Sequence, residues 1–131
     1  MTKKASLSTA ATIALLLAAG LFFSSAPASA SPAKTPKKTV YGAIAANRDG
    51  KAVGYAYDFK TSKDAKREAL RQCGEQKCEV LVTFRNGCAA AASGKGKVVT
   101  MTGTTRDEAE TKVMRKCGKD CAVLAWACTK Q

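Results

Sequence analysis

Two stretches of the chain share one spacing of apolar and polar positions. In each, four apolar residues stand at i, i+4, i+5 and i+8: Ala65, Ala69, Leu70 and Cys73 in residues 61–74, and Ala109, Val113, Met114 and Cys117 in residues 105–118. At 100° per residue these positions form one stripe, and the residues between them are mostly charged. Threonines before each stretch can cap a helix, and the glycine after each cysteine suits its end. The pattern predicts two short amphipathic helices.

The segments around both predicted helices are rich in residues that favour β-strands. One strand-favouring stretch follows each helix. Two further stretches, arranged like a hairpin, precede each helix. The expected strands cover residues 42–46, 53–59, 80–84, 89–92, 98–102 and 123–127. Asp49–Gly50 and Asn86–Gly87 are sequences typical of tight turns between strands. The pattern therefore predicts two copies of strand, strand, helix, strand.

Neither copy can cover its own apolar face, because each offers only three strands and one helix. Side by side, the two copies can share a single sheet and cover it together. We therefore expect an α+β fold: two strand-strand-helix-strand repeats form one antiparallel sheet, both helices lie on one face, and disulfides stabilise the whole. The repeat accounts for a fold with pseudo-twofold character and by itself names no activity.

Three aromatic residues alternate along the strand before the first predicted helix, at Tyr55, Tyr57 and Phe59. Their rings would share one strand face, which could be a stacking platform or part of the core. In the register of the repeat their counterparts are Val99, Met101 and Gly103. Because an aliphatic counterpart is typical of a core, we interpret this face as packed against the helices. Trp126 is the better candidate for an exposed aromatic.

The first 40 residues differ in composition from the rest. Residues 1–30 combine two early lysines, an apolar run and Ala28-Ser29-Ala30, which together predict a cleaved signal peptide rather than a membrane anchor. Residues 31–40 are rich in proline and lysine and predict a flexible basic tail. Residues 41–131 then form a single domain. We expect a secreted protein with no stable membrane insertion after cleavage of the signal.

All six cysteines lie after residue 30, namely Cys73, Cys78, Cys88, Cys117, Cys121 and Cys128. An even number in a small exported chain indicates disulfides, for which sequence alone allows fifteen pairings. Cysteines 73 and 117 end the predicted helices, and cysteines 78 and 121 begin the strands that follow. We therefore predict Cys73–Cys78 and Cys117–Cys121 as local clamps, and Cys88–Cys128 as a bridge from the central strand to the last. That long-range bridge should stabilise the fold most.

The residue types present favour binding over catalysis. The chain has no histidine, so no metal ion, cofactor or enzymatic activity is expected. After residue 30, 20 basic and 10 acidic residues leave a net charge of +10. Such an excess attracts anionic polymers or surfaces, although it can also serve solubility alone. The candidate binding residues are Arg71, Arg85, Arg115, Lys116 and Trp126.

Several motifs resemble a known family. They are YGAIA at 41–45, GYAYDF at 54–59, the cysteine-flanked run at 78–88 and the C-x-V-x-A-W-x-C of 121–128. Together they resemble the domain of unknown function 4189 family of small secreted bacterial proteins, some suspected of host interaction. The resemblance implies a fold and an exported location. We expect a secreted, non-enzymatic binding module for an anionic polymer or a protein partner. The alternative is a small extracellular hydrolase, or an inhibitor presenting residues 47–51 or 93–97.

Overall fold

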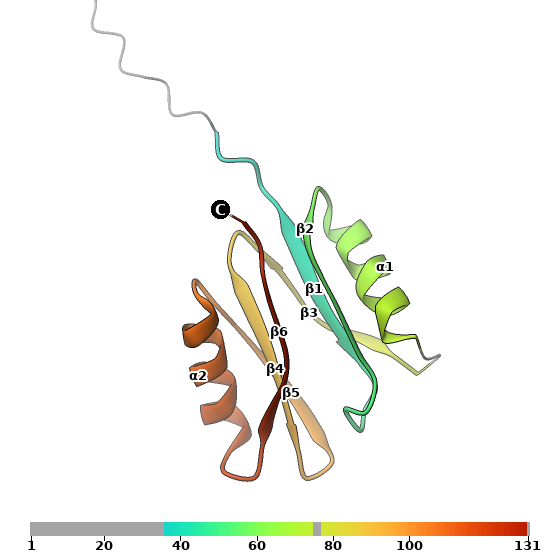
Figure 1. Cartoon of the computed structure of the whole chain (residues 1–131), viewed down its shortest axis with the longest axis vertical. Helices are drawn as coiled ribbons and strands as arrows, with labels where there is room; N and C mark the ends of the chain where they lie inside the picture. The colour runs from blue at the N-terminus through green and yellow to red at the C-terminus, as the bar shows by residue number, and fades with distance from the viewer. Residues whose placement is uncertain (1–35, 75–76, 131) are drawn as a thin grey trace, which may run out of the picture. The chain divides into compact units, whose positions relative to one another are not determined.

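The computed structural model describes residues 36–74 and 77–130. Figure 1 shows the elements of this part of the chain. In order, they are β1 (Tyr41–Ala46), β2 (Val53–Phe59), α1 (Ser62–Cys73), β3 (Glu79–Arg85), β4 (Cys88–Gly94), β5 (Lys97–Gly103), α2 (Arg106–Cys117) and β6 (Ala122–Cys128). The predicted signal peptide and residues 31–35 of the predicted tail lie outside the described residues. Residues 36–40 form neither helix nor strand.

Local sequence accounts for where both helices begin and end. Thr61 and Thr105 adopt extended backbone, and their hydroxyls accept hydrogen bonds from the N–H groups three residues later. Gly74 ends α1 in the left-handed conformation, with φ 72° and ψ 0°. Gly118 ends α2 at φ 103° and ψ −173°, so it also needs a positive φ but leaves the helix in a more extended conformation. Both predicted helices are therefore present.

The strands form two antiparallel sheets of three strands, in the orders β2-β1-β3 and β5-β4-β6. The α+β class is confirmed, but the expectation of one shared sheet is wrong. The reason lies in the central strands β1 and β4, in which residues 42–46 and 88–92 are all buried. Helices on one face of a single sheet would leave every second residue of these strands in water. Two stacked sheets bury both faces.

The described domain has four layers, with α1 and α2 on the outer sides of the two sheets (Figure 1). One apolar cluster lies between α1 and the first sheet, and another between α2 and the second sheet. The third cluster joins the sheets to each other and includes Ile44 and Phe84 from the first, and Ala91 and Ala125 from the second. Each helix therefore covers its own sheet, and the sheets cover one another.

Small side chains let these layers approach closely. Alanine occupies most of the fully buried positions in β1 and β4. On β2, a Cβ atom added to Gly54 would lie 2.1 Å from the carbonyl oxygen of Ala69 and 2.3 Å from the backbone nitrogen of Cys73. The backbone of α1 therefore rests directly on β2, at a place where no side chain fits.

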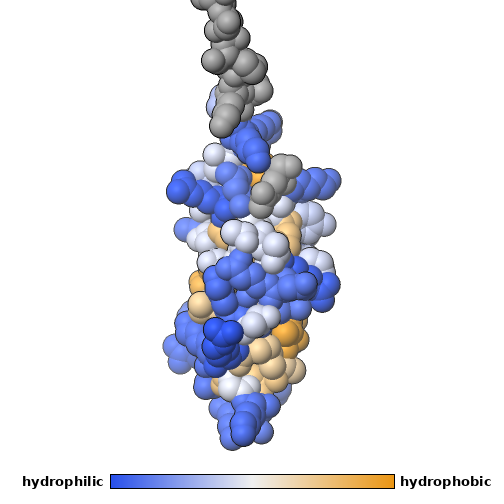
Figure 2. Space-filling model, turned by 90° about the vertical axis from the view of Figure 1, so that its left-hand side faces the viewer, coloured by the Kyte–Doolittle hydropathy of each residue, from blue (hydrophilic) through white to orange (hydrophobic). Residues whose placement is uncertain are grey.

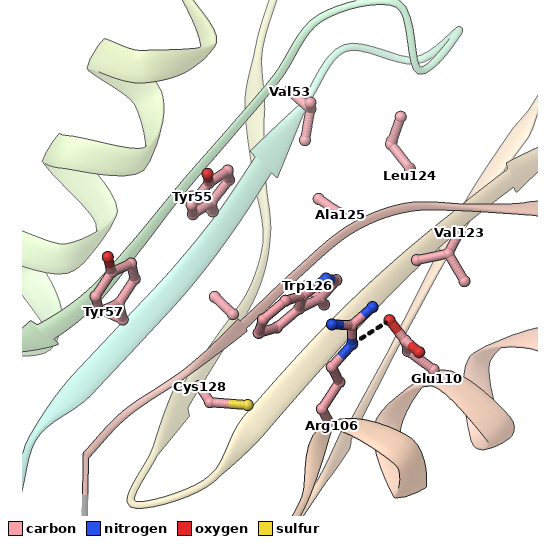
Figure 3. A pocket seen from close by; sticks show the side chains of 11 residues that line it. Val53, Tyr55, Tyr57, Arg106, Glu110, Val123, Leu124, Ala125, Trp126 and Cys128 are labelled. Atoms are coloured by element: carbon pink, nitrogen blue, oxygen red, sulfur yellow. Dashed lines mark hydrogen bonds and ion pairs between the residues drawn. The ribbon is translucent and has the colours of Figure 1, made fainter.

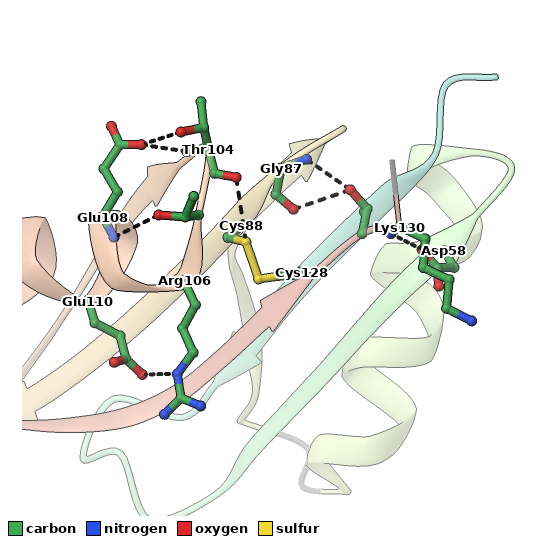
Figure 4. The surroundings of a disulfide bond; sticks show 11 residues. Asp58, Gly87, Cys88, Thr104, Arg106, Glu108, Glu110, Cys128 and Lys130 are labelled. Atoms are coloured by element: carbon green, nitrogen blue, oxygen red, sulfur yellow. Dashed lines mark hydrogen bonds and ion pairs between the residues drawn. A yellow bond between two sulfur atoms is a disulfide. The ribbon is translucent and has the colours of Figure 1, made fainter. Parts of the chain in front are cut away.

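The cysteines lie in the three predicted pairs. The sulfur atoms of Cys73 and Cys78 are 2.03 Å apart, those of Cys117 and Cys121 1.97 Å, and those of Cys88 and Cys128 2.07 Å. The first two pairs close the turn after each helix. Cys88 and Cys128 lie directly opposite each other on β4 and β6 (Figure 4). The predicted pairing is therefore confirmed, including the bridge from a central strand to the last.

Asn86–Gly87 makes a turn, but it carries the chain from one sheet to the other. Strands β3 and β4 are not hydrogen-bonded to each other, so this turn closes no hairpin. The Asn86 N–H donates to the carbonyl oxygen of Val40 at 3.1 Å. The Gly87 N–H donates to the Thr129 hydroxyl at 2.8 Å, and the Thr129 N–H donates back to the Gly87 carbonyl at 2.9 Å. Residues near both ends of the domain, Val40 and Thr129, therefore hold the turn that connects the two sheets.

Candidate functional site

The tyrosines of β2 face away from α1, so their assignment to the core under the helices is wrong. Tyr55 lies opposite Ile44, which belongs to the cluster between the sheets. Tyr55 and Tyr57 are 42% and 49% exposed. Phe59, in contrast, packs into the cluster beneath α1. The three rings therefore do not share one face.

A single residue causes this change of side. Asp58 has a φ of 63° within β2, and the pairing of β1 with β2 shifts register at the same place. Such a bulge moves every residue beyond it to the other face of the strand. The Lys130 N–H donates to Asp58 Oδ1 at 2.7 Å, which holds the bulge (Figure 4). The sequence repeat runs without a gap here, so it could not reveal the shift.

The exposed tyrosines line a groove of about 840 Å³ between β2 and β6. Both strands are edges of their sheets. β2 contributes Tyr55 and Tyr57, β6 contributes Trp126, and the first two turns of α2 contribute Arg106 and Glu110. Figure 3 shows Trp126 between the two tyrosines and Arg106. Aromatic and charged side chains from both halves of the domain therefore meet in one place.

Arg106 is fixed against Trp126 from two directions. Its guanidinium carbon lies 3.9 Å from the centre of the Trp126 ring, within the range of a cation–π contact. Its Nε donates to Glu110 Oε1 at 2.9 Å, across one helical turn (Figure 3). The guanidinium Nη atoms have no hydrogen-bond partner among the described residues. They remain available as paired donors.

The first turn of α2 holds Arg106 in this position. Glu108, two residues further on, accepts hydrogen bonds from the N–H and hydroxyl of Thr104 at 2.7 and 2.6 Å (Figure 4). Its own N–H donates to the hydroxyl of Thr105 at 3.2 Å. Hydrogen bonds from Lys112 and Thr104 lower the pKa of Glu108 to about 2. The ionised carboxylate caps the helix start and so steadies the turn that carries Arg106.

Of the predicted binding residues, only Trp126 lies in this groove, where it is 39% exposed. Arg71 is on α1 and is paired with Glu68, whose pKa falls to about 2 because Arg71 and then Gln72 donate hydrogen bonds to it. Arg85 ends β3, and Arg115 and Lys116 lie in the last turn of α2. The two helices occupy opposite outer layers. The structure therefore does not gather these cations into one surface.

Arg106 and Glu110 are site residues that sequence reasoning did not single out. Their only signal in the chain is an oppositely charged pair at i and i+4, which is ordinary on an exposed helix. Their importance depends on Trp126, which lies 20 positions away from Arg106 in the sequence. No local pattern brings these two side chains together.

The side of the domain that carries α2 is largely polar. Figure 2 views the side that carries α2 and shows hydrophilic residues over most of it, with hydrophobic residues gathered in its lower part. Among the described residues, no three His, Cys, Asp or Glu side chains are grouped as ligands for a metal ion. No helix in the described part of the chain has the length and apolar composition needed to cross a membrane.

Comparison with known proteins connects the domain to mycobacterial relatives. The chain is 35% identical over 88 residues to uncharacterized proteins of Mycobacterium tuberculosis (Rv1813c) and Mycobacterium bovis (Mb1843c). This match covers 67% of the chain and 59% of the length of those curated relatives.

The fold is similar as well. The NMR structure of Rv1813c superposes with a TM-score of 0.57 at 29% identity, over 90% of this chain and 99% of that one. Residues 41–128 match the family described as Domain of unknown function (DUF4189). This match includes every helix and strand of the described structure. The chain therefore belongs to the DUF4189 family.

Proposed function

We propose that the protein is a secreted, non-enzymatic binding module that holds an anionic polymer in the groove between β2 and β6. The observation that carries this proposal is the meeting of Tyr55, Tyr57 and Trp126 with Arg106 along one open groove. Exposed aromatic rings offer large contact areas at a low cost in conformational entropy. Arg106 adds a donor suited to an anionic group.

The net charge supports the choice of an anionic partner. An excess of +10 after residue 30 attracts polyanions over a distance and raises the rate of encounter. The surface cations lie on both outer helices, so they act as a general field rather than a specific contact. In this proposal the charge brings the polymer to the protein, and the groove holds it.

The composition of the groove favours binding over hydrolysis. Glu110 is the only carboxylate among the described residues that line it, and this carboxylate is paired with Arg106. Hydrolysis by two carboxylates needs a second acidic group several ångströms away. The groove supplies none among these residues. We therefore propose a binding role for it.

Replacing the aromatic residues by threonine tests the proposal. The full chain, exported and purified with its disulfides formed, would be titrated against heparin, DNA and polygalacturonate at low and near-physiological salt. We expect the triple variant Tyr55→Thr, Tyr57→Thr, Trp126→Thr to bind at least one of these polymers roughly tenfold more weakly than the parent, because stacking contacts are lost. Binding by the parent should also weaken as salt rises.

The matched control is Leu70→Ala on α1, which removes an apolar side chain that is 38% exposed but lies outside the groove. It should leave binding unchanged. If the triple variant binds every polymer as tightly as the parent does, the groove is not the binding site. If the parent binds none of them at near-physiological salt, the proposal of an anionic polymer is wrong.

A protein partner is the second candidate, favoured by the position of the groove. Both β2 and β6 are edge strands, so each has one side outside the hydrogen-bonding pattern of its own sheet. An extended peptide can add to such an edge and place alternate side chains in a neighbouring groove. Protection of the amides of β2 or β6 from hydrogen exchange by a bound peptide, without any polymer binding, would favour this function.

A further inference from the structure

We propose that the anionic polymer is a polysaccharide that carries carboxylates, and that Arg106 is the residue that selects them. This inference rests on the proposed function and narrows its partner to one chemical class. The groove combines flat aromatic surfaces for sugar rings with one fixed guanidinium for an acidic group.

The first observation is the orientation of Arg106. Its Nε is occupied by Glu110, and its carbon lies over the ring of Trp126, so the side chain is held before any partner arrives. The Nη atoms are free of hydrogen bonds among the described residues. The two Nη atoms can donate in parallel to the two oxygens of one carboxylate, a geometry that lysine does not provide. The Arg106 side chain is still 49% exposed, so a polymer can reach it.

The second observation is the pair of tyrosines on β2. Residues two apart on a strand lie about 6.6 Å apart along it and point to the same side, so Tyr55 and Tyr57 present two neighbouring rings to the groove that Trp126 also lines. Each ring has an apolar face and a hydroxyl at its tip. A sugar ring has an apolar C–H face and polar hydroxyls at its rim, which matches both features. The open shape of the groove suits a chain that continues beyond it at either end.

The third observation concerns the density of charge. Within the described part of the chain, Arg106 and Glu110 are the only formally charged residues that line the groove, so these residues leave it close to neutral. A nucleic acid would bring a phosphate with every nucleotide and place several of them near Glu110. A uronic acid polymer has one carboxylate on each sugar, separated by neutral ring surface. The aromatic area and the single available cation therefore fit a carboxylated polysaccharide better.

The test compares polymers that differ in one feature at a time. Polygalacturonate has both rings and carboxylates, its fully methyl-esterified form keeps the rings without the charge, and polyglutamate keeps the charge without sugar rings. The full chain would be titrated against each, and against single-stranded DNA, at near-physiological salt. We expect polygalacturonate to bind roughly tenfold or more tightly than the other three, since both parts of the groove are then engaged.

Two matched variants separate geometry from charge. Arg106→Lys keeps the positive charge and loses the paired donors, so it should lower the preference for polygalacturonate over its methyl ester by roughly tenfold. Arg67→Lys is the control, because Arg67 is also an exposed helical arginine paired with an acidic residue, Asp64, and it lies outside the groove. It should leave the preference unchanged.

The outcomes also distinguish this inference from the proposed function. Equal binding of the methyl ester or of polyglutamate would overturn the inference, as would tighter binding of DNA. In each case the groove would remain a binding site if the threonine variants at Tyr55, Tyr57 and Trp126 weaken that binding. An Arg106→Lys variant with an unchanged preference would overturn the role of Arg106. Absence of binding to all four polymers would overturn the inference, and absence of binding to heparin as well would overturn the proposed function.

Discussion

In the first half of the domain, Tyr41 lies opposite Arg85 across β1 and β3, whereas in the second half Cys88 lies opposite Cys128 at the same place across β4 and β6. Tyr41 and Phe59 are paired across β1 and β2, and both pack against the cluster under α1. In the second sheet Cys88 belongs to the cluster under α2 and is bonded to Cys128 on the neighbouring strand. The first residue of β1 is therefore held by aromatic packing, whereas the first residue of β4 is held by a covalent bond.

The two edges of the stacked sheets differ as well, and each edge is formed by one strand from each half. The groove between β2 and β6 has Tyr55, Tyr57 and Trp126, while the hollow between the ends of β3 and β5 is about 410 Å³ in volume and has Thr83 and Thr102. Threonine fits the same pleated surface but offers little area for a partner. β2 and β6 form one edge of the stacked sheets, and β3 and β5 form the other. Among the described residues, large exposed aromatic side chains line only the edge at β2 and β6.

The largest expected difference concerns the disulfides. Replacing Cys88 and Cys128 by alanine removes a link between residues 40 positions apart, whereas the two local pairs close loops of 5 and 4. In the chain-entropy description, the long loop should cost about 4 kcal/mol of unfolding free energy and each short loop about 2 kcal/mol. Urea denaturation followed by circular dichroism measures both. Equal losses would show that the length of the closed loop does not set the order of the three disulfides.

The next prediction compares how closely each helix approaches its sheet. Gly54→Ala places a Cβ atom against the backbone of α1, so we expect a loss of about 3 kcal/mol, or failure to fold. On β5, Val99 packs under α2, and Val99→Ala should cost only about 1–2 kcal/mol. Thermal unfolding of both variants checks this order. A Gly54→Ala variant as stable as the parent would mean that α1 lies further from β2.

The smallest expected effect is on the pH dependence of stability. Glu68 on α1 and Glu108 on α2 both have a pKa lowered from 4.5 to about 2, mainly by hydrogen bonds from Arg71 and Lys112 respectively. Because the folded pKa lies below the unfolded one, the stabilisation is present above about pH 4.5 and is lost as the pH falls toward 2. Glu68→Gln and Glu108→Gln should each reduce the amount of stability that is lost between pH 4.5 and pH 2.

Melting temperatures measured from pH 7 to 2 would show a smaller decrease in the variants than in the parent protein. The effect should be small and should shrink in high salt, because these are surface pairs. The two variants should have effects of similar size, because the pKa is lowered from 4.5 to about 2 in both carboxyls. A clearly smaller effect of one variant would mean that its carboxylate does not keep these hydrogen bonds in solution.

Local features of the sequence were sufficient for the elements and the disulfides. Helical spacing, threonine caps and terminal glycines depend on residues within a few positions of each other. The cysteine pairs could be predicted because the position of each cysteine relative to its helix or strand is itself local. Trp126 could be named as an exposed aromatic for a similar reason. All of these expectations agree with the structure.

The number of sheets and the position of the site depended on contacts between distant segments. The run of buried residues in β1 and β4 was a signal for strands covered on both faces, yet only the stacking of the sheets showed what covers them. A bulge at Asp58 placed Tyr55 and Tyr57 on the opposite face from Phe59, because one extra residue reverses the sides of a strand. Arg106 reaches Trp126 only after α2 packs on its sheet, since no pattern along the chain encodes the distance between them.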